Sequence, residues 1–185
     1  HISKSVYVKC KIENNSLNIK DLNNKEIFLL IWTTTPWTLP ANKAISINKD
    51  FKYGIYKDEE SYLIIEDELA KNIEIKKNKN IKHIQTIPTD LLLNLKYFSP
   101  ISTDLCPVLE ADYVTRDTGT GLVHTAPGHG IDDYSTGIKN SLDIFSPVDS
   151  SGRFTSEVKD ELVGLNVLKE GNDAVVDELE KSNLL

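Results

Sequence analysis

The chain contains no methionine, only two cysteines, and no apolar run that approaches the roughly 20 residues needed to cross a bilayer. No secretory apolar stretch follows His1. Cys10 and Cys106 lie far apart and form no Cys-x-x-Cys pair, so they indicate neither a disulfide framework nor a zinc finger. These absences predict a cytoplasmic, reduced protein without a membrane segment. The missing start residue predicts a piece cut from a longer polypeptide.

Positive charge is also scarce. The 185 residues include 21 Lys and Arg against 28 Asp and Glu, which gives a net charge of −7. Because binding to nucleic acid requires clustered basic side chains that neutralise phosphates, this chain is not expected to grip nucleic acid by itself. If RNA is a substrate, most of the affinity must come from elsewhere. The basic stretch at residues 71–82 is a local exception, and its simplest interpretation is a solvated turn or helix end.

Short apolar stretches dominate what is present, and β-branched and aromatic residues are enriched in them. We expect the fold class α+β: a β-barrel-rich single domain, residues 1–185, with a few peripheral helices. Strands are expected at residues 6–12, 17–19, 26–33, 44–47, 53–56, 62–65, 108–114 and 121–125. Turns are expected at residues 14–15, 23–24 and 117–119, the last joining the final two strands. Helices are expected at residues 66–72, 132–140 and 172–181, the last capped by Asn172.

A cluster of hydroxyl groups follows the strand expected at residues 26–33. Residues 32–42 read Trp-Thr-Thr-Thr-Pro-Trp-Thr-Leu-Pro-Ala-Asn, and the two prolines prevent the strand from continuing in a ladder. The loop therefore holds four threonine hydroxyls and the Asn42 amide in a rigid segment. Such groups suit a site that binds an ester, a ribose or a water without a formal charge. The alternative is a threonine-rich strand end with Trp37 in the core.

A second unusual segment lies at an expected strand-to-helix transition. Residues 119–134 read Gly-Thr-Gly-Leu-Val-His-Thr-Ala-Pro-Gly-His-Gly-Ile-Asp-Asp-Tyr. Glycines around a strand allow the backbone to approach a ligand closely. Two histidines and two aspartates fall within ten residues of this segment. Several kinds of chemistry use such a set of side chains.

A metal site of His124, His129 and Asp133 is one alternative. Zinc motifs usually place two histidines on one helical turn, whereas a proline and glycines separate these two. A triad of Ser135, His124 and Asp132 is another, although no Gly-x-Ser-x-Gly elbow is present. A dinucleotide site is disfavoured because the third glycine is not at its expected spacing. The remaining interpretation is a carboxylate that anchors an ammonium group beside a histidine that shapes a small pocket.

Together, the two segments closely resemble the signature segments of the editing insertion of isoleucyl-tRNA synthetases, in the form typical of bacteria and organelles. Residues 148–154 and 164–167 are also similar to that family, so the resemblance covers nearly the whole chain. The valine and leucine enzymes resemble the chain less. They carry Thr-Thr-Arg-Pro in place of residues 33–36 and Ala-His-Asp in place of residues 128–130.

The resemblance implies the editing-domain fold of class I aminoacyl-tRNA synthetases and the hydrolysis of valine wrongly attached to tRNA(Ile). It implies that Thr33, Thr34 and Thr35 are catalytic residues that position the terminal ribose and the attacking water. It implies that Asp133 is also catalytic and anchors the α-ammonium group, and that His124 is a wall that admits valine and excludes isoleucine. Further substrate-binding residues are expected in the same two motifs: Trp37, Asn42, Gly128 and His129.

The motifs contain no strong general base, so the vicinal ribose hydroxyl of the substrate is expected to assist the attacking water. No metal and no cofactor is expected for this reaction, although the parent ligase binds ATP. The expected partners are the 3′ end of tRNA(Ile) carrying valine and the remainder of the synthetase, and the chain itself is expected to be monomeric. Two rival functions remain, namely a non-catalytic tRNA-binding module with a degraded site and an unrelated metal-dependent hydrolase.

Overall fold

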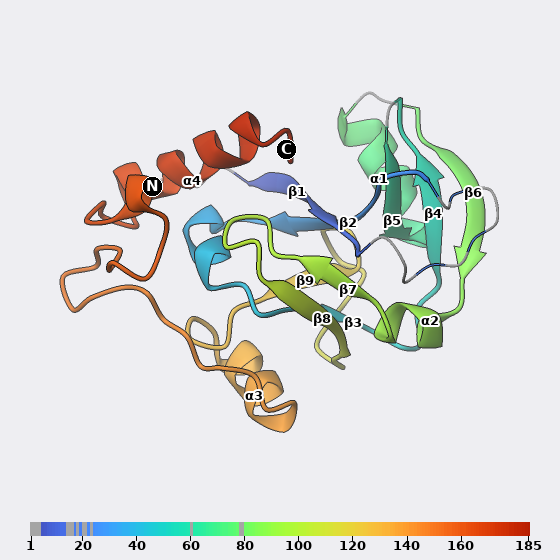
Figure 1. Ribbon diagram of the computed structural model, residues 1–185. Coiled ribbons are helices and arrows are strands. Elements are labelled where there is room, and N and C mark those ends of the chain that lie inside the picture. Colours follow the sequence, from blue (N-terminus) through green and yellow to red (C-terminus); the bar gives the residue numbers. More distant parts are fainter. Residues whose placement is uncertain are drawn as a thin grey trace.

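The computed structural model describes residues 5–13, 17, 19, 22, 24–59, 61–77 and 80–185 of the chain. Short strands predominate, with a few helices around them (Figure 1). The strands are β1 Val6–Lys11, β2 Ile27–Thr33, β3 Ala44–Ile47, β4 Tyr53–Lys57, β5 Tyr62–Glu66, β6 Lys82–Ile87, β7 Lys96–Phe98, β8 Leu105–Glu110 and β9 Leu122–Thr125. The helices are α1 Asp67–Lys77, α2 Thr89–Leu93, α3 Ile131–Lys139 and α4 Glu170–Lys181, with the 3-10 helices η1 Pro36–Ala41 and η2 Asp160–Leu162.

Strand pairing forms two mixed sheets. The first has the order β1-β2-β5-β4-β6, and the second has the order β7-β8-β3-β9. The pairs β2–β5 and β3–β8 are parallel, and the other pairs are antiparallel. In Figure 1, α1 lies against the first sheet, whereas α3 and α4 lie at the outside of the molecule. The predicted α+β class with peripheral helices is therefore confirmed.

The predicted barrel is not formed, because both sheets are open within the described residues. A barrel requires its first and last strands to pair. Here the free edge of β1 is covered by the C-terminal segment, since the Lys9 N–H donates to the Leu184 carbonyl at 2.8 Å. The opposite edge strand, β6, is mostly exposed. The two sheets are linked after the end of β1, where Ile12 forms an antiparallel bridge with Tyr97.

The hairpin predicted from residues 108–114 and 121–125 is wrong. Strand β8 ends at Glu110, and β3 lies between β8 and β9, parallel to the first and antiparallel to the second. All four residues of β3 are buried. A short apolar strand of this kind is stable only with both edges paired, so it separates the two strands that are neighbours in sequence. Residues 111–114 consequently lie in a loop that leads to the candidate site.

The remaining predicted strands and helices are confirmed in type, whereas the 3-10 helices η1 and η2 and three further elements were not predicted. These three, β6, α2 and β7, are short or carry mainly exposed side chains, so they lack an apolar pattern. The strand and turns predicted between residues 14 and 24 lie partly outside the described residues. Where Leu17 and Ile19 are described, the Ile19 N–H donates to the Leu17 carbonyl at 2.9 Å, which is a tight turn and not a strand contact.

The predicted cap of the last helix is also wrong. Helix α4 begins at Glu170, so Asn172 lies within its first turn. The Asn172 side chain serves another element instead, because its Oδ1 accepts the backbone N–H of Trp37 at 3.2 Å. This contact ties α4 to η1, which lies beside the candidate site.

The core explains why β2 reads as a continuous apolar run. Leu29 and Ile31 belong to a cluster of buried side chains drawn from both sheets, whereas Phe28 and Leu30 belong to a second cluster with residues of α1. Strand β2 is therefore buried on both faces. No helix in the described part of the chain is long and apolar enough to cross a membrane.

Candidate functional site

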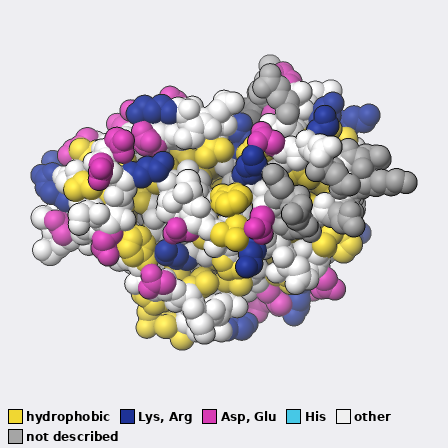
Figure 2. Space-filling view, in the orientation of Figure 1, with side chains coloured by type: hydrophobic (Ala, Val, Ile, Leu, Met, Phe, Trp, Pro, Cys, Tyr) yellow, Lys and Arg dark blue, Asp and Glu magenta, His cyan; other side chains and the backbone are white. Residues whose placement is uncertain are grey.

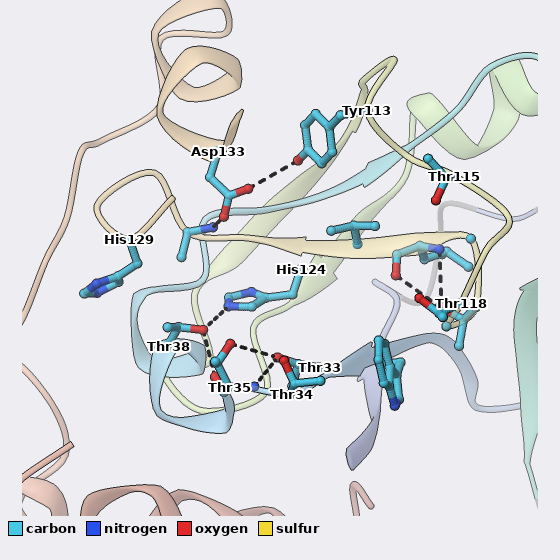
Figure 3. Close-up of a pocket in the computed structure, with 17 residues that line it drawn as sticks. Thr33, Thr34, Thr35, Thr38, Tyr113, Thr115, Thr118, His124, His129 and Asp133 are labelled. Atoms are coloured by element: carbon cyan, nitrogen blue, oxygen red, sulfur yellow. Dashed lines mark hydrogen bonds between the residues drawn. The ribbon is translucent and has the colours of Figure 1, made fainter. Parts of the chain in front are cut away.

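A cavity of about 360 Å³ lies where β2 ends, beside β9 and the N-terminus of α3. This volume lies within the range of small-molecule sites. Both sequence motifs contribute to its wall, although they are far apart in the chain. The predicted residues that line it are Thr33, Thr34, Thr35, His124, His129 and Asp133. In Figure 3, the ring of His124 lies between the Asp133 carboxylate and the threonine hydroxyls.

The threonine segment forms one side of the cavity. Thr33 is the last residue of β2, and Pro36 begins η1, so the chain turns sharply between them. The turn is held by the Thr35 N–H, which donates to Thr33 Oγ1 at 3.0 Å, and the two hydroxyl oxygens are 3.4 Å apart. The side chains of Thr34 and Thr35 are exposed at the cavity. This side of the space is thus lined by neutral hydroxyls.

The Asp133 carboxylate forms the opposite end of the cavity. It lies in the first turn of α3, where the helix dipole favours negative charge. Its Oδ2 accepts the Ala126 N–H at 2.8 Å, and its Oδ1 lies 3.5 Å from the Tyr113 hydroxyl (Figure 3). Partial burial raises the pKa of Asp133 above its usual range, and these two hydrogen bonds oppose the rise. A cation that enters the cavity would find one oriented carboxylate.

Tyr113 was not predicted as a site residue. Its hydroxyl donates to Ser46 Oγ at 3.1 Å and lies 3.3 Å from Thr125 Oγ1. Burial raises its pKa, so the phenol is neutral at physiological pH. Ser46 lies on β3 and Thr125 on β9, and these two strands pair. The pairing brings both side chains to the Tyr113 hydroxyl, which lies beside Asp133. No local pattern in the sequence contains that information.

His124 faces the cavity from β9 and is almost fully buried. Both ring nitrogens have partners. Asn42 Nδ2 lies 2.7 Å from Nδ1, and Thr38 Oγ1 lies 2.9 Å from Nε2. Burial, with a smaller contribution from His129, lowers the pKa of His124 to about 4. At neutral pH this residue is therefore an uncharged side chain whose polar atoms are already bonded, which suits a wall better than a base.

Three predicted residues do not line the cavity. Asn42 is fully buried behind His124, and Trp37 lies beside the wall with its ring edge-on to His129 at 5.0 Å between centroids. Gly128 is packed so closely that a Cβ there would lie 2.2 Å from the Phe145 carbonyl oxygen. These residues support the wall and do not form its surface.

The far wall of the cavity comes from the loop before β9. This loop lines the space with Thr115, Thr118 and residues 119–121, and Trp32 of β2 lines it as well. Gly121 has a φ of +77°, and a Cβ there would lie 2.3 Å from the Glu66 Cβ. Glu66 is fully buried, and its Oε1 accepts from Arg116 Nε at 2.9 Å. The loop is therefore anchored to β5 by a glycine contact and an ion pair.

The structure does not assemble the alternative sites. The Ser135 hydroxyl donates to the Ile131 carbonyl on the exposed side of α3, away from His124, so no triad forms. A metal bound to His124 would have to displace the hydrogen-bond partner of one of its ring nitrogens. Within the described part of the chain, no group of three His, Cys, Asp or Glu side chains has an arrangement that could hold a metal ion.

The chain is similar to a segment of isoleucine–tRNA ligases, although no protein-family model matches it. It is 42% identical over 188 residues to an isoleucine–tRNA ligase of Acaryochloris marina, a match that covers 100% of the chain and 19% of that ligase. It is 37% identical over 187 residues to the mitochondrial isoleucine–tRNA ligase of Schizosaccharomyces pombe, again covering 100% of the chain and 19% of the ligase. The chain thus spans about one fifth of the length of these relatives.

Solved structures with the same fold are more distant in sequence. The crystal structure of GlLeuRS-CP1 has a TM-score of 0.76 at 17% identity and covers 98% of this chain and 97% of that chain. The Plasmodium falciparum cytosolic leucyl-tRNA synthetase editing domain has a TM-score of 0.68 at 11% identity, with 99% of each chain covered. At these identities the likeness concerns the fold alone.

Proposed function

Because the chain belongs, as a segment, to the isoleucine–tRNA ligase family, we propose that it is an editing domain that hydrolyses valine misattached to tRNA(Ile). The observation that carries this proposal is the cavity itself, with an oriented carboxylate at one end, neutral hydroxyls at the other, and an uncharged His124 between them. An aminoacyl ester has matching parts: a free α-ammonium group, a ribose with its ester, and an apolar side chain.

Selection by size is the proposed basis of specificity. Isoleucine and valine differ by one methylene, which a hydrophobic pocket distinguishes by only about 1–3 kcal/mol, a limit for which these ligases are themselves the usual illustration. A second pocket that accepts valine and excludes isoleucine removes the error after it is made. His124 suits the excluding wall because it is buried and fixed at both ring nitrogens. A fixed ring cannot yield to an additional methylene without breaking hydrogen bonds.

The proposed reaction is attack of water on the ester, with the threonine hydroxyls positioning the ribose and the water. His124 is unsuited to remove a proton, because its pKa is low and its Nδ1 already accepts a hydrogen bond. The vicinal ribose hydroxyl of the substrate is the proposed proton relay. Asp133 binds the α-ammonium group and fixes the amino acid in the cavity. The proposed site thus uses orientation and hydrogen bonds more than acid–base chemistry.

The proposed partners are the 3′ end of tRNA(Ile) and the remainder of a full-length ligase. The face shown in Figure 2 carries Lys and Arg interspersed with Asp and Glu and has no continuous basic surface. Together with the net charge of −7, this supports the view that other parts of the ligase hold the tRNA. A monomeric state and a cytoplasmic location remain predictions, and one relative is named as mitochondrial.

The experiment that tests the function compares deacylation of Val-tRNA(Ile) and Ile-tRNA(Ile) by this chain, alone and within its full-length ligase. We expect hydrolysis of the valyl ester to exceed that of the isoleucyl ester. Binding of tRNA without hydrolysis in either form would support a non-catalytic module instead.

Thr35→Ala and Thr34→Ala should slow deacylation while the fold is retained, because these side chains face the cavity and not the core. Each lost neutral hydrogen bond costs about 0.5–1.5 kcal/mol, or about two- to ten-fold in rate, and more if it forms only in the transition state. Single-turnover deacylation and a thermal melt measure the two effects. Thr155→Ala is a control, since the Thr155 hydroxyl bonds to Glu157 on the surface. A much lower melting temperature with unchanged turnover would make the threonines structural.

Chelators should leave the deacylation rate unchanged, because His124 has no ring nitrogen available for a metal. The measurement is the rate after prolonged incubation with EDTA or 1,10-phenanthroline, with metal analysis of the treated protein. Loss of activity that zinc restores would overturn the proposed mechanism and favour a metal-dependent hydrolase.

A further inference from the structure

We propose that Tyr97, which does not touch the cavity, is a positioning residue that sets the tautomer and orientation of His124 and thereby the size discrimination of the pocket. The proposal rests on the editing function proposed above. It concerns a residue outside both sequence motifs, on the short strand β7. Tyr97 is fully buried.

The first link joins Tyr97 to Asn42. The Tyr97 hydroxyl donates to Asn42 Oδ1 at 2.6 Å, and Asn42 Nδ2 donates to the Ala44 carbonyl at 3.0 Å. A hydroxyl donor at one end and a carbonyl acceptor at the other distinguish the two ends of the amide. The orientation of Asn42 is therefore fixed by two contacts, one of them from Tyr97.

The second link joins Asn42 to His124. Asn42 Nδ2 lies 2.7 Å from His124 Nδ1, and because an amide nitrogen can only donate, Nδ1 is the acceptor. In a neutral imidazole the proton then lies on Nε2, which donates to Thr38 Oγ1 at 2.9 Å. The tautomer is thus assigned by the hydrogen-bond pattern.

This series of hydrogen bonds ends in the threonine segment of the cavity. Thr38 Oγ1 accepts from His124 and donates its own hydrogen to the Thr35 carbonyl at 3.0 Å. Every bond from Tyr97 to Thr35 runs in the same direction. Hydrogen bonds in series strengthen one another, so the loss of the bond from Tyr97 weakens the donor and acceptor arrangement of each bond that follows it. The Tyr97 hydroxyl therefore orients the wall of the pocket, whereas the turn beside it is also held by the Thr35 N–H, which donates to Thr33 Oγ1.

Removing the Tyr97 hydroxyl takes away one of the two contacts that orient Asn42. In Tyr97→Phe the Asn42 Oδ1 is buried without that donor, which weakens the preference for the observed amide orientation. The reversed amide would present Oδ1 to His124 and favour the tautomer with its proton on Nδ1. His124 would then be held less firmly against the additional methylene of isoleucine.

The test combines a spectroscopic and a kinetic measurement on Tyr97→Phe. In protein labelled with 15N-histidine, two-bond NMR correlations report which ring nitrogen of His124 carries the proton. We expect Nε2–H in the wild type and a measurable share of Nδ1–H in the variant. We also expect the ratio of Ile-tRNA to Val-tRNA hydrolysis to rise by about five-fold or more, with the Val-tRNA rate within about two-fold of wild type.

Tyr56→Phe is the matched control. Tyr56 is also buried and donates to a side-chain oxygen, Asp67 Oδ1 at 2.8 Å, but it belongs to the other core cluster. It should change neither the His124 tautomer nor the ratio of rates. A purely structural role for Tyr97 would lower the melting temperature and leave both readouts unchanged, which would overturn the proposal.

The wild-type spectrum needs no variant and so tests the chain of bonds even if Tyr97→Phe does not fold. A proton on Nδ1 in the wild type would overturn the proposal, and so would a changed tautomer with an unchanged ratio of rates. A wild-type chain that fails to deacylate Val-tRNA in its full-length ligase would instead refute the proposed function. The two failures are therefore distinguishable.

Discussion

Asp133→Ala should reduce the hydrolysis of Val-tRNA(Ile) by about thirty-fold to several thousand-fold, the effect of about 2–5 kcal/mol that follows loss of one partner of a desolvated charge pair. The free α-ammonium group is the charged part of an aminoacyl ester, and Asp133 is the carboxylate that lines the cavity beside Tyr113 and Ala126. Without it, the amino acid loses its anchor. Single-turnover deacylation measures the loss.

Two further variants separate charge from packing. Asp133→Asn retains a side-chain oxygen for the Ala126 N–H but has no charge, so it should be nearly as inactive as the alanine variant. Asp132→Ala is the control, because its exposed carboxylate on the same helix does not line the cavity. Burial raises the pKa of Asp133. When the pH is lowered, wild-type activity should therefore begin to fall at a pH above the ordinary pKa of an aspartate. Retention of more than half of the wild-type rate in Asp133→Ala would remove this residue from the site.

His124→Ala should allow the domain to hydrolyse Ile-tRNA(Ile) as well as Val-tRNA(Ile). If the ring excludes one methylene, its removal should raise the rate on the isoleucyl ester relative to the valyl ester by about ten- to two-hundred-fold, the range expected for that group. A full-length ligase with this change would then destroy its correct product. The measurement is the ratio of the two deacylation rates, together with net formation of Ile-tRNA.

The ratio is informative because a wall acts on the difference between substrates, whereas a base or metal ligand acts on their shared chemistry. An equal fall on both esters would end the size-exclusion hypothesis and leave the editing assignment intact. His83→Ala is the control, since His83 is exposed on β6. The loss of a buried ring should lower the melting temperature of the His124 variant, so rates are compared well below that temperature.

The fold was predictable where the apolar pattern of a segment is enough to identify it as a strand or a helix. The continuous apolar run of β2 and the four buried residues of β3 are visible in the sequence. The position of β3 between β8 and β9 is not visible, because it depends on contacts between segments that are far apart. Strand β6 was missed for a different reason, as an edge strand with mainly exposed side chains has no apolar alternation.

The wall of the cavity was predictable where its residues lie in two compact motifs, whereas their roles remain predictions. Thr33, His124 and Asp133 all line the cavity. Tyr113 was missed because its approach to Asp133 depends on strand pairing. Asn42 was expected to bind substrate, yet it lies behind His124 with its side chain fully bonded. A motif shows which residues act together, but it does not show which of them face the ligand.

The placement of β3 has a consequence for the order of folding. Asn42, which follows η1 and precedes β3, and His124, on β9, are separated by 82 positions in the chain, and their contact forms only when β3 and β9 pair. Loop closure over such a distance is entropically costly and slow. On a ribosome, the threonine segment emerges long before the strand that completes the cavity. The cavity, and with it the proposed hydrolytic competence, is therefore complete only after β9 has paired with β3.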